Sequence, residues 1–69
     1  MKYLVIYKKT ATGYSACAPD LPGCITTGTM LQETELLMKE AIEFHIEGLR
    51  EDGLPIPAPS TTADYITAA

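Results

Sequence analysis

The residues best suited to acid–base chemistry or metal binding are one histidine and two cysteines. His45 is the only histidine among the 69 residues, and the cysteines are Cys17 and Cys24. A general base usually needs a group that orients it, and His45 falls on the apolar side of a helical pattern, where a packed, hydrogen-bonded histidine is the better interpretation. A structural zinc site takes four ligands, which these three residues do not complete. We therefore expect no metal site and interpret the cysteines as buried free thiols.

Asp20 raises the separate question of a metal-dependent nuclease, because it is the one acidic residue in a tight turn flanked by prolines. Such an enzyme needs several carboxylates that converge on one or two ions. The other carboxylates are spread along a predicted helix, and Asp side chains commonly bond the backbone of their own turn. The sequence also lacks a glycine-rich phosphate loop and a nucleophile with a nearby base. We expect no catalytic residue and no cofactor, so the chain is not predicted to be an enzyme.

Charge and length narrow the kinds of partner. The net charge is −4 and only five residues are basic, whereas nucleic-acid binders carry a basic surface, so direct binding of DNA or RNA is not expected. An acidic surface suits a basic protein partner, although the same charge also serves simple solubility.

Residues 1–69 form one domain, and a domain this short buries only ~60% of its unfolded surface. We therefore predict a homo-oligomer.

Nothing in the sequence indicates export or membrane insertion. The apolar run at residues 3–7 is too short for a signal peptide, and no stretch approaches the ~20 apolar residues of a membrane span. Two cysteines are too few for a disulfide framework. The expected location is the cytoplasm, with reduced thiols.

Three short strands are predicted to open the chain. Residues 3–7 are apolar on both faces, residues 14–18 follow a break that ends in Gly13, and residues 24–27 follow a turn through Pro22-Gly23. Pro-Gly is the preferred central pair of a type II turn, in which glycine supplies a positive φ. These segments predict an antiparallel meander. The two apolar faces of the first strand suggest a helix on one side and a second subunit on the other.

A helix is predicted from Met30 to about Asp52. Thr29 is the expected N-cap, Gln32 holds the capping-box position, and Gly53 marks the end. One stripe of the helical wheel is expected to pack on the sheet, namely Met30, Thr34, Leu37, Met38, Ala41, Phe44, His45, Gly48 and Leu49.

The opposite side of this helix carries the candidate partner-binding residues. It holds most of the acidic residues, interrupted by Leu36 and Ile46. We select Glu40, Glu43 and Glu47 for charge matching with a basic partner, and Leu36 as an apolar anchor. An ordinary solvated helix presents the same residue types, so this choice is a hypothesis.

After the helix, residues 54–62 alternate prolines and predict an extended strap. The strap leads to a short strand pattern over residues 63–67, which could return as a fourth, edge strand. The predicted order is β-β-β-α-β, an α+β two-layer domain with an antiparallel sheet and one long helix on one face.

Two of these segments resemble a known family. The opening strand followed by Tyr14-Ser15-Ala16 and Pro19-Asp20-Leu21-Pro22-Gly23-Cys24 is similar to the HicB antitoxins. So is the segment from Ala41 to Gly53, followed by Pro55-Ile56-Pro57. The resemblance covers nearly the whole chain, and the two motifs stand in the right order and spacing.

The resemblance implies a β-β-β-α-β domain described as a partial ribonuclease H fold. It also implies an antitoxin of a type II toxin–antitoxin system, which binds a small basic HicA-like mRNA-cleaving toxin and covers its catalytic histidine. Family members form dimers or tetramers, and many carry a further DNA-binding domain. Residues 1–69 show no such domain, so direct operator binding is not expected. The alternative is an orphan self-assembling structural or regulatory module with no toxin partner.

Overall fold

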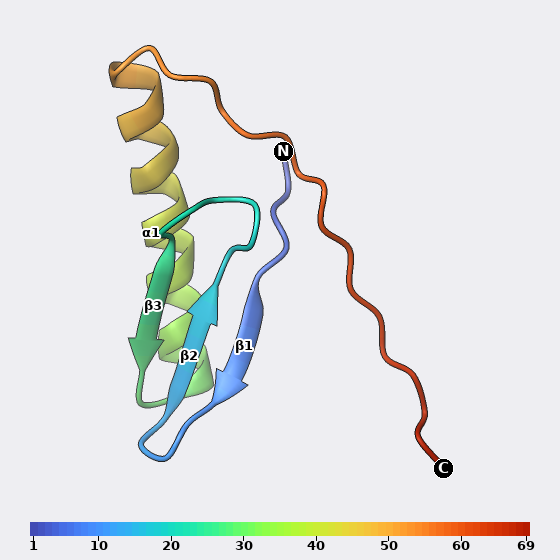
Figure 1. The fold of residues 1–69 in the computed structure, drawn as a ribbon. Coiled ribbons are helices and arrows are strands. Elements are labelled where there is room, and N and C mark those ends of the chain that lie inside the picture. Colours follow the sequence, from blue (N-terminus) through green and yellow to red (C-terminus); the bar gives the residue numbers. More distant parts are fainter.

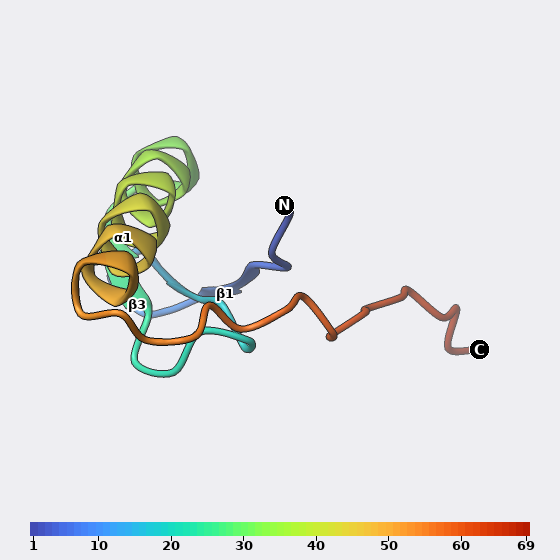
Figure 2. The same cartoon turned by 90° about the horizontal axis from the view of Figure 1, so that it is seen from above.

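A computed structural model describes all residues 1–69 (Figure 1). Three strands, β1 (Ile6–Lys9), β2 (Tyr14–Cys17) and β3 (Ile25–Gly28), form an antiparallel sheet in the order β1-β2-β3 and are followed by one helix, α1 (Leu31–Glu51). The helix covers one face of the sheet and leaves the other open (Figure 2). The predicted meander and α+β class are confirmed. No helix is both long and apolar enough to cross a membrane.

Glycines set the two hairpin connections. Gly23 has φ +80°, and the backbone N–H of Cys24 donates to the carbonyl oxygen of Leu21 at 3.1 Å, as the Pro-Gly type II turn requires. Gly13 is needed for a different reason. A Cβ atom at this position would lie 2.1 Å from the carbonyl oxygen of Gly28, so the close approach of β2 to the end of β3 excludes a side chain.

The start of α1 differs from the prediction by one residue. The N-cap is Met30, which makes no side-chain capping bond. The backbone N–H of Thr29 donates instead to the Glu33 carboxylate at 3.0 Å, so Glu33, rather than Gln32, is the side chain that reaches back to the backbone before the helix. The end is as predicted. Gly53 has φ +66°, and the N–H of Leu54 bonds the carbonyl of Leu49 at 2.9 Å, which is a Schellman motif.

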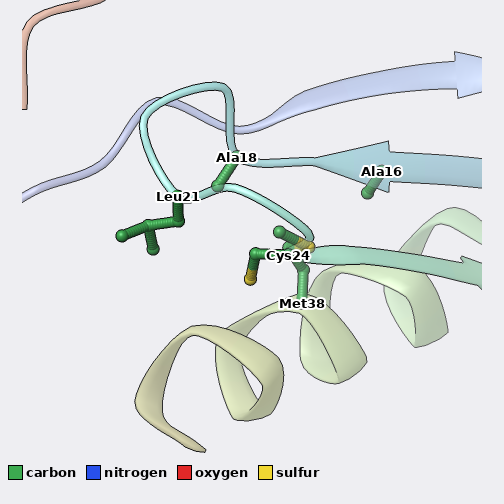
Figure 3. Packing of buried hydrophobic residues seen from close by; sticks show 5 residues of the cluster. All are labelled: Ala16, Ala18, Leu21, Cys24 and Met38. Atoms are coloured by element: carbon green, nitrogen blue, oxygen red, sulfur yellow. The ribbon is translucent and has the colours of Figure 1, made fainter. Parts of the chain in front are cut away.

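The fully buried core is small and lies between β2, the β2–β3 loop and the middle of α1. Met38 rises from α1 toward Cys24 on the loop (Figure 3). The five members are Ala16, Ala18, Leu21, Cys24 and Met38. Tyr3, Val5, Ala41, Ile42 and Ile46 are partly buried against this cluster.

Two helix residues exchange their predicted roles. Phe44, expected on the packed stripe, is 78% exposed, whereas Ile46, expected on the polar side, is half-buried against the core. The reason is the position of α1, which contacts β3 and β2 but not β1. The helix is therefore rotated so that Ile42 and Ile46 are partly buried against the core on the side of Tyr3, and Phe44 turns away from the sheet.

The expected fourth strand is absent. Residues 54–69, hereafter the tail, contain no helix or strand, and this part of the prediction over residues 63–67 is wrong for the single chain. From the end of α1 the tail first crosses to the N-terminus and then runs in the same direction as β1, beyond the β1 edge of the sheet (Figures 1 and 2). Tyr65 and Ile66 are almost fully exposed, and the tail forms no ladder with the free outer edge of β1.

Candidate functional site: the outward face of the helix

The residues with possible acid–base or metal chemistry are not brought together. No group of three or more His, Cys, Asp or Glu side chains is placed to hold a metal ion. Cys24 is buried and Cys17 half-buried, both as free thiols, and burial raises the pKa of the Cys24 thiol. His45 is half-buried on α1. These positions agree with packing roles for all three side chains.

Asp20 binds the tail rather than its own turn, which corrects its predicted role. Its carboxylate accepts bonds from the backbone N–H groups of Ser60 (2.9 Å) and Thr61 (3.0 Å). It also accepts bonds from their hydroxyls, at 3.1 Å and 2.6 Å. These donors, the Thr61 hydroxyl first, lower the pKa of Asp20 to about 2. Every lone-pair direction is therefore used for holding the chain, and none is left for a metal ion.

The four predicted partner-binding residues form one exposed row on α1. Leu36, Glu40, Glu43 and Glu47 follow one another at spacings of four, three and four residues, which places them on one side of a helix. All four side chains are exposed, and Leu36 remains 58% accessible. The side chain of α1 that faces the core is Met38, so this row points away from the sheet.

Phe44 is the member of this surface that the sequence pattern missed. It is the only phenylalanine of the chain and is 78% exposed. Glu40 lies one turn before it and Glu47 one turn after it, so the ring stands beside the row of carboxylates. The sequence did contain a signal for the exposure of Phe44. An aromatic residue with acidic residues one helical turn before and after it lies at the border of the polar side.

The charges of α1 are divided between two sides. On a wheel of 100° per residue, Phe44, Leu36 and five carboxylates fall within an arc of roughly 100° that contains no cation. We call this surface the acidic face of α1; its members are Glu33, Leu36, Glu40, Glu43, Phe44, Glu47 and Glu51. Lys39 and Arg50 lie outside it, toward β1. This face therefore carries five carboxylates and no cation of its own, although Lys39 and Arg50 lie next to its border.

A groove lies along the border of the acidic face. Because α1 leaves β1 uncovered, a hollow of about 370 Å³ opens between the first residues of the chain and the helix. Its lining includes the apolar residues Tyr3, Ile42 and Ile46 together with the charged residues Glu43, Glu47 and Arg50. A neighbouring hollow is lined by Tyr7, whose pKa is raised by partial burial, with a smaller contribution from Glu35. The acidic face therefore borders a recess that is partly apolar.

Comparison with known proteins identifies the family. The profile of the HicB-like antitoxin of bacterial toxin-antitoxin system matches residues 3–69. The chain belongs to this family. The HicA3 and HicB3 toxin-antitoxin complex contains a chain of the same fold, with a TM-score of 0.73 and 32% identity, over 87% of this chain and 70% of that one.

Relatives of this HicB-like chain occur in a phage and in archaea. A 14.9 kDa protein in the rep-hol intergenic region of Haemophilus phage HP1 is 42% identical over 66 residues, which are 96% of this chain and 50% of that protein. The chain therefore spans half the length of the phage relative. A UPF0150 protein of Thermoplasma acidophilum is 43% identical over 58 residues, covering 83% of this chain and 84% of the relative.

Proposed function

We propose that this HicB-like antitoxin neutralises a small basic HicA-like toxin by placing the acidic face of α1 on the toxin's RNA-binding surface. The observation that carries the proposal is the exposure of Phe44 beside an unbroken row of carboxylates. An aromatic side chain that the chain's own core does not use is suited to an apolar pocket on a partner.

The two kinds of residue would contribute in different ways. Aromatic anchors at the centre of an interface carry much of the binding energy when surrounding residues exclude water from them. Carboxylates at the rim mainly raise the association rate and exclude partners of the wrong charge. Phe44 and Leu36 are therefore the proposed anchors, and Glu40, Glu43 and Glu47 the steering residues.

Inhibition would follow from occupancy alone. A domain seated on the toxin's RNA-binding surface blocks access of the RNA, and its negative field repels the phosphates of any strand that approaches. The same field disfavours direct binding of nucleic acid by the antitoxin domain. Support comes from the family membership and from the solved relative, which is part of a toxin–antitoxin complex.

The test is an RNA-cleavage assay with a HicA-like toxin from the same genome, with and without this chain. Wild-type chain is expected to abolish cleavage at a stoichiometric ratio. Phe44→Ala is expected to weaken binding by about 2 kcal/mol, close to 30-fold. Tyr65→Ala, which removes an exposed aromatic side chain far from α1, is the matched control and should inhibit as the wild type does. Failure of the wild-type chain to bind the toxin would refute the proposal.

A further inference from the structure

The first residues of the chain form one side of the groove beside α1, although the sheet does not hold them. The ladder between β1 and β2 begins at Ile6, and none of the backbone hydrogen bonds outside the helix and the sheet involves residues 1–5. The helix contacts β2 and β3 but not β1. Tyr3 nevertheless lies half-buried against the core and lines the groove. Its position therefore needs support from elsewhere in the chain.

That support comes from the first part of the tail, residues 54–62, hereafter the strap. From the end of α1 the strap crosses to the N-terminus (Figure 1), where the Tyr3 hydroxyl donates a hydrogen bond to the carbonyl oxygen of Pro57. Ile56 and Pro57 are half-buried, whereas the other residues of the strap are exposed. The strap therefore contacts the first residues of the chain at its middle, through Tyr3.

The far end of the strap is fastened to the β2–β3 loop. Ser60 and Thr61 donate four hydrogen bonds to the Asp20 carboxylate, two from backbone N–H groups and two from hydroxyls. Bonds to an ionised carboxylate are shorter and stronger than bonds between neutral groups. Together with the Tyr3 bond, they are the hydrogen bonds that join residues 55–69 to the rest of the chain. The strap is thus held at two points beyond the end of the helix.

The strap is stiff enough to connect these two points mechanically. Pro55, Pro57 and Pro59 occupy alternate positions, and each proline fixes its own φ and restricts the residue before it to an extended conformation. Such a segment behaves as a semi-rigid spacer rather than as a flexible coil. The distance along the strap from Pro57 to Ser60 is about 9 Å in a polyproline conformation. A displacement of the strap at Asp20 is therefore transmitted to the Tyr3 bond instead of being absorbed between them.

The position of Tyr3 matters for the surface beside it. Tyr3 lines the same hollow of about 370 Å³ as Glu43 and Glu47, and both glutamates belong to the acidic face of α1. Ile42 and Ile46 lie in the same lining. Movement of the Tyr3 ring would therefore change the width of the recess that borders the proposed docking surface.

We propose that Asp20 is a positioning residue for this groove. It holds the strap through Ser60 and Thr61, and the strap holds Tyr3 beside Ile42 and Ile46 of α1. The β2–β3 loop is in this way connected to the surface of the helix through a segment that has no secondary structure. The positioning role does not require a toxin, and only its consequence for toxin affinity rests on the proposed function.

The experiment compares the isoleucine methyl resonances of the full chain and its variants by NMR. An aromatic ring shifts the methyl resonances of its neighbours, so Ile42 and Ile46 report the position of Tyr3. Tyr3→Leu removes the ring and gives the reference direction of the shift. Asp20→Ala, which removes all four bonds, is expected to shift both methyl resonances in that direction by part of that amount. Asp64→Ala is the matched control, because this carboxylate accepts a bond only from the next residue's N–H, and it should leave both resonances in place.

Two further variants test the route. Tyr3→Phe keeps the ring and removes the bond to Pro57, so Asp20→Ala should add no further shift when it is combined with Tyr3→Phe. Ser60→Ala with Thr61→Val removes the two hydroxyl donors from the side of the strap and should give a smaller shift in the same direction as Asp20→Ala. Circular dichroism should report unchanged helix content in these variants, because none of the altered groups belongs to the buried core.

Two outcomes would overturn the proposal. Methyl resonances of Ile42 and Ile46 that stay at their wild-type positions in Asp20→Ala would show that the Asp20 contact does not reach the groove. Additive shifts in the double variant would show that Asp20 acts by a route other than Tyr3. The measurement contains no toxin, so its failure would leave the proposed antitoxin function standing, and failure of the RNA-cleavage assay would leave the positioning role standing.

Discussion

The hydroxyl of Thr61 donates a hydrogen bond of 2.6 Å to the carboxylate of Asp20, which lies 41 residues earlier in the chain. The same carboxylate holds Ser60 and the Thr61 backbone, so one side chain in the β2–β3 loop fixes the course of the tail. A single ionisable group therefore links the sheet to a segment that has no secondary structure of its own.

This contact should be lost in acid. The pKa of Asp20 is lowered from its ordinary value of 3.8 to about 2 in the folded chain. A lowered pKa means that the contact contributes fully above pH 4 and is lost as the pH falls through about 2. Amide chemical shifts of Ser60 and Thr61, followed by NMR from pH 7 to pH 1.5, should titrate together with that midpoint. Asp20→Asn should show no such titration, and a midpoint near 4 in the wild type would contradict the contact.

Because α1 is rotated relative to the orientation predicted from the sequence, truncation of two of its apolar residues should affect the free energy of unfolding very differently. Met38 is buried and Phe44 is 78% exposed. Met38→Ala should therefore lower the free energy of unfolding by about 2–5 kcal/mol, a large share for so small a domain. Phe44→Ala should change it by less than about 0.5 kcal/mol. Urea unfolding followed by circular dichroism measures both, and equal losses would mean that Phe44 belongs to the core.

Two glycines provide a matched test of the backbone. A Cβ at Gly13 meets the carbonyl oxygen of Gly28, whereas a Cβ at Gly48, in the interior of α1, meets nothing within 4 Å. Gly48→Ala should stabilise the chain by about 0.5–1 kcal/mol, because alanine loses less conformational freedom on entering a helix. Gly13→Ala should destabilise it, since the β2–β3 pairing must shift. The midpoints of thermal unfolding should move in opposite directions.

Local signals in the sequence were sufficient for one hairpin turn and for the end of the helix. They were not sufficient for the first strand, predicted over residues 3–7 and found at Ile6–Lys9, or for the N-cap, which is Met30 rather than Thr29. Pro22-Gly23 specified its turn, and Gly53 specified the end of α1, because each depends on a backbone conformation that few other residues adopt. The row from Leu36 to Glu47 could also be placed on one side of the helix. Here the reason is helical periodicity, which fixes the residues that share a side, whatever the helix packs against.

The rotation of α1 could not be predicted in this way. It depends on how many strands the helix covers, and α1 lies over β2 and β3 but not β1. That arrangement decides that Ile46 is half-buried and Phe44 exposed, although both lie near the border of the apolar stripe. The tail was misassigned for a related reason. Residues 63–67 have a strand pattern, but they lie beside the free edge of β1 without forming a ladder with it.

The charge of the acidic face supplies the last prediction, a comparison of two single reversals. Glu40→Lys lies within the face, and Glu35→Lys, the matched control, lies outside it, near Tyr7. Both change the net charge equally, so a difference between them reports position alone. Glu40→Lys should slow association with a HicA-like toxin by about tenfold at low salt, and Glu35→Lys much less.

Stopped-flow measurements at several salt concentrations separate steering from contact. Screening should bring the rates of Glu40→Lys and wild type together as the ionic strength rises toward 1 M, where the Debye length falls to about 3 Å. The triple reversal of Glu40, Glu43 and Glu47 should remove most of the salt dependence of the association rate. Equal effects of the reversals at positions 35 and 40 would show that only the overall charge matters, and the assignment of the acidic face as the docking surface would then have to be abandoned.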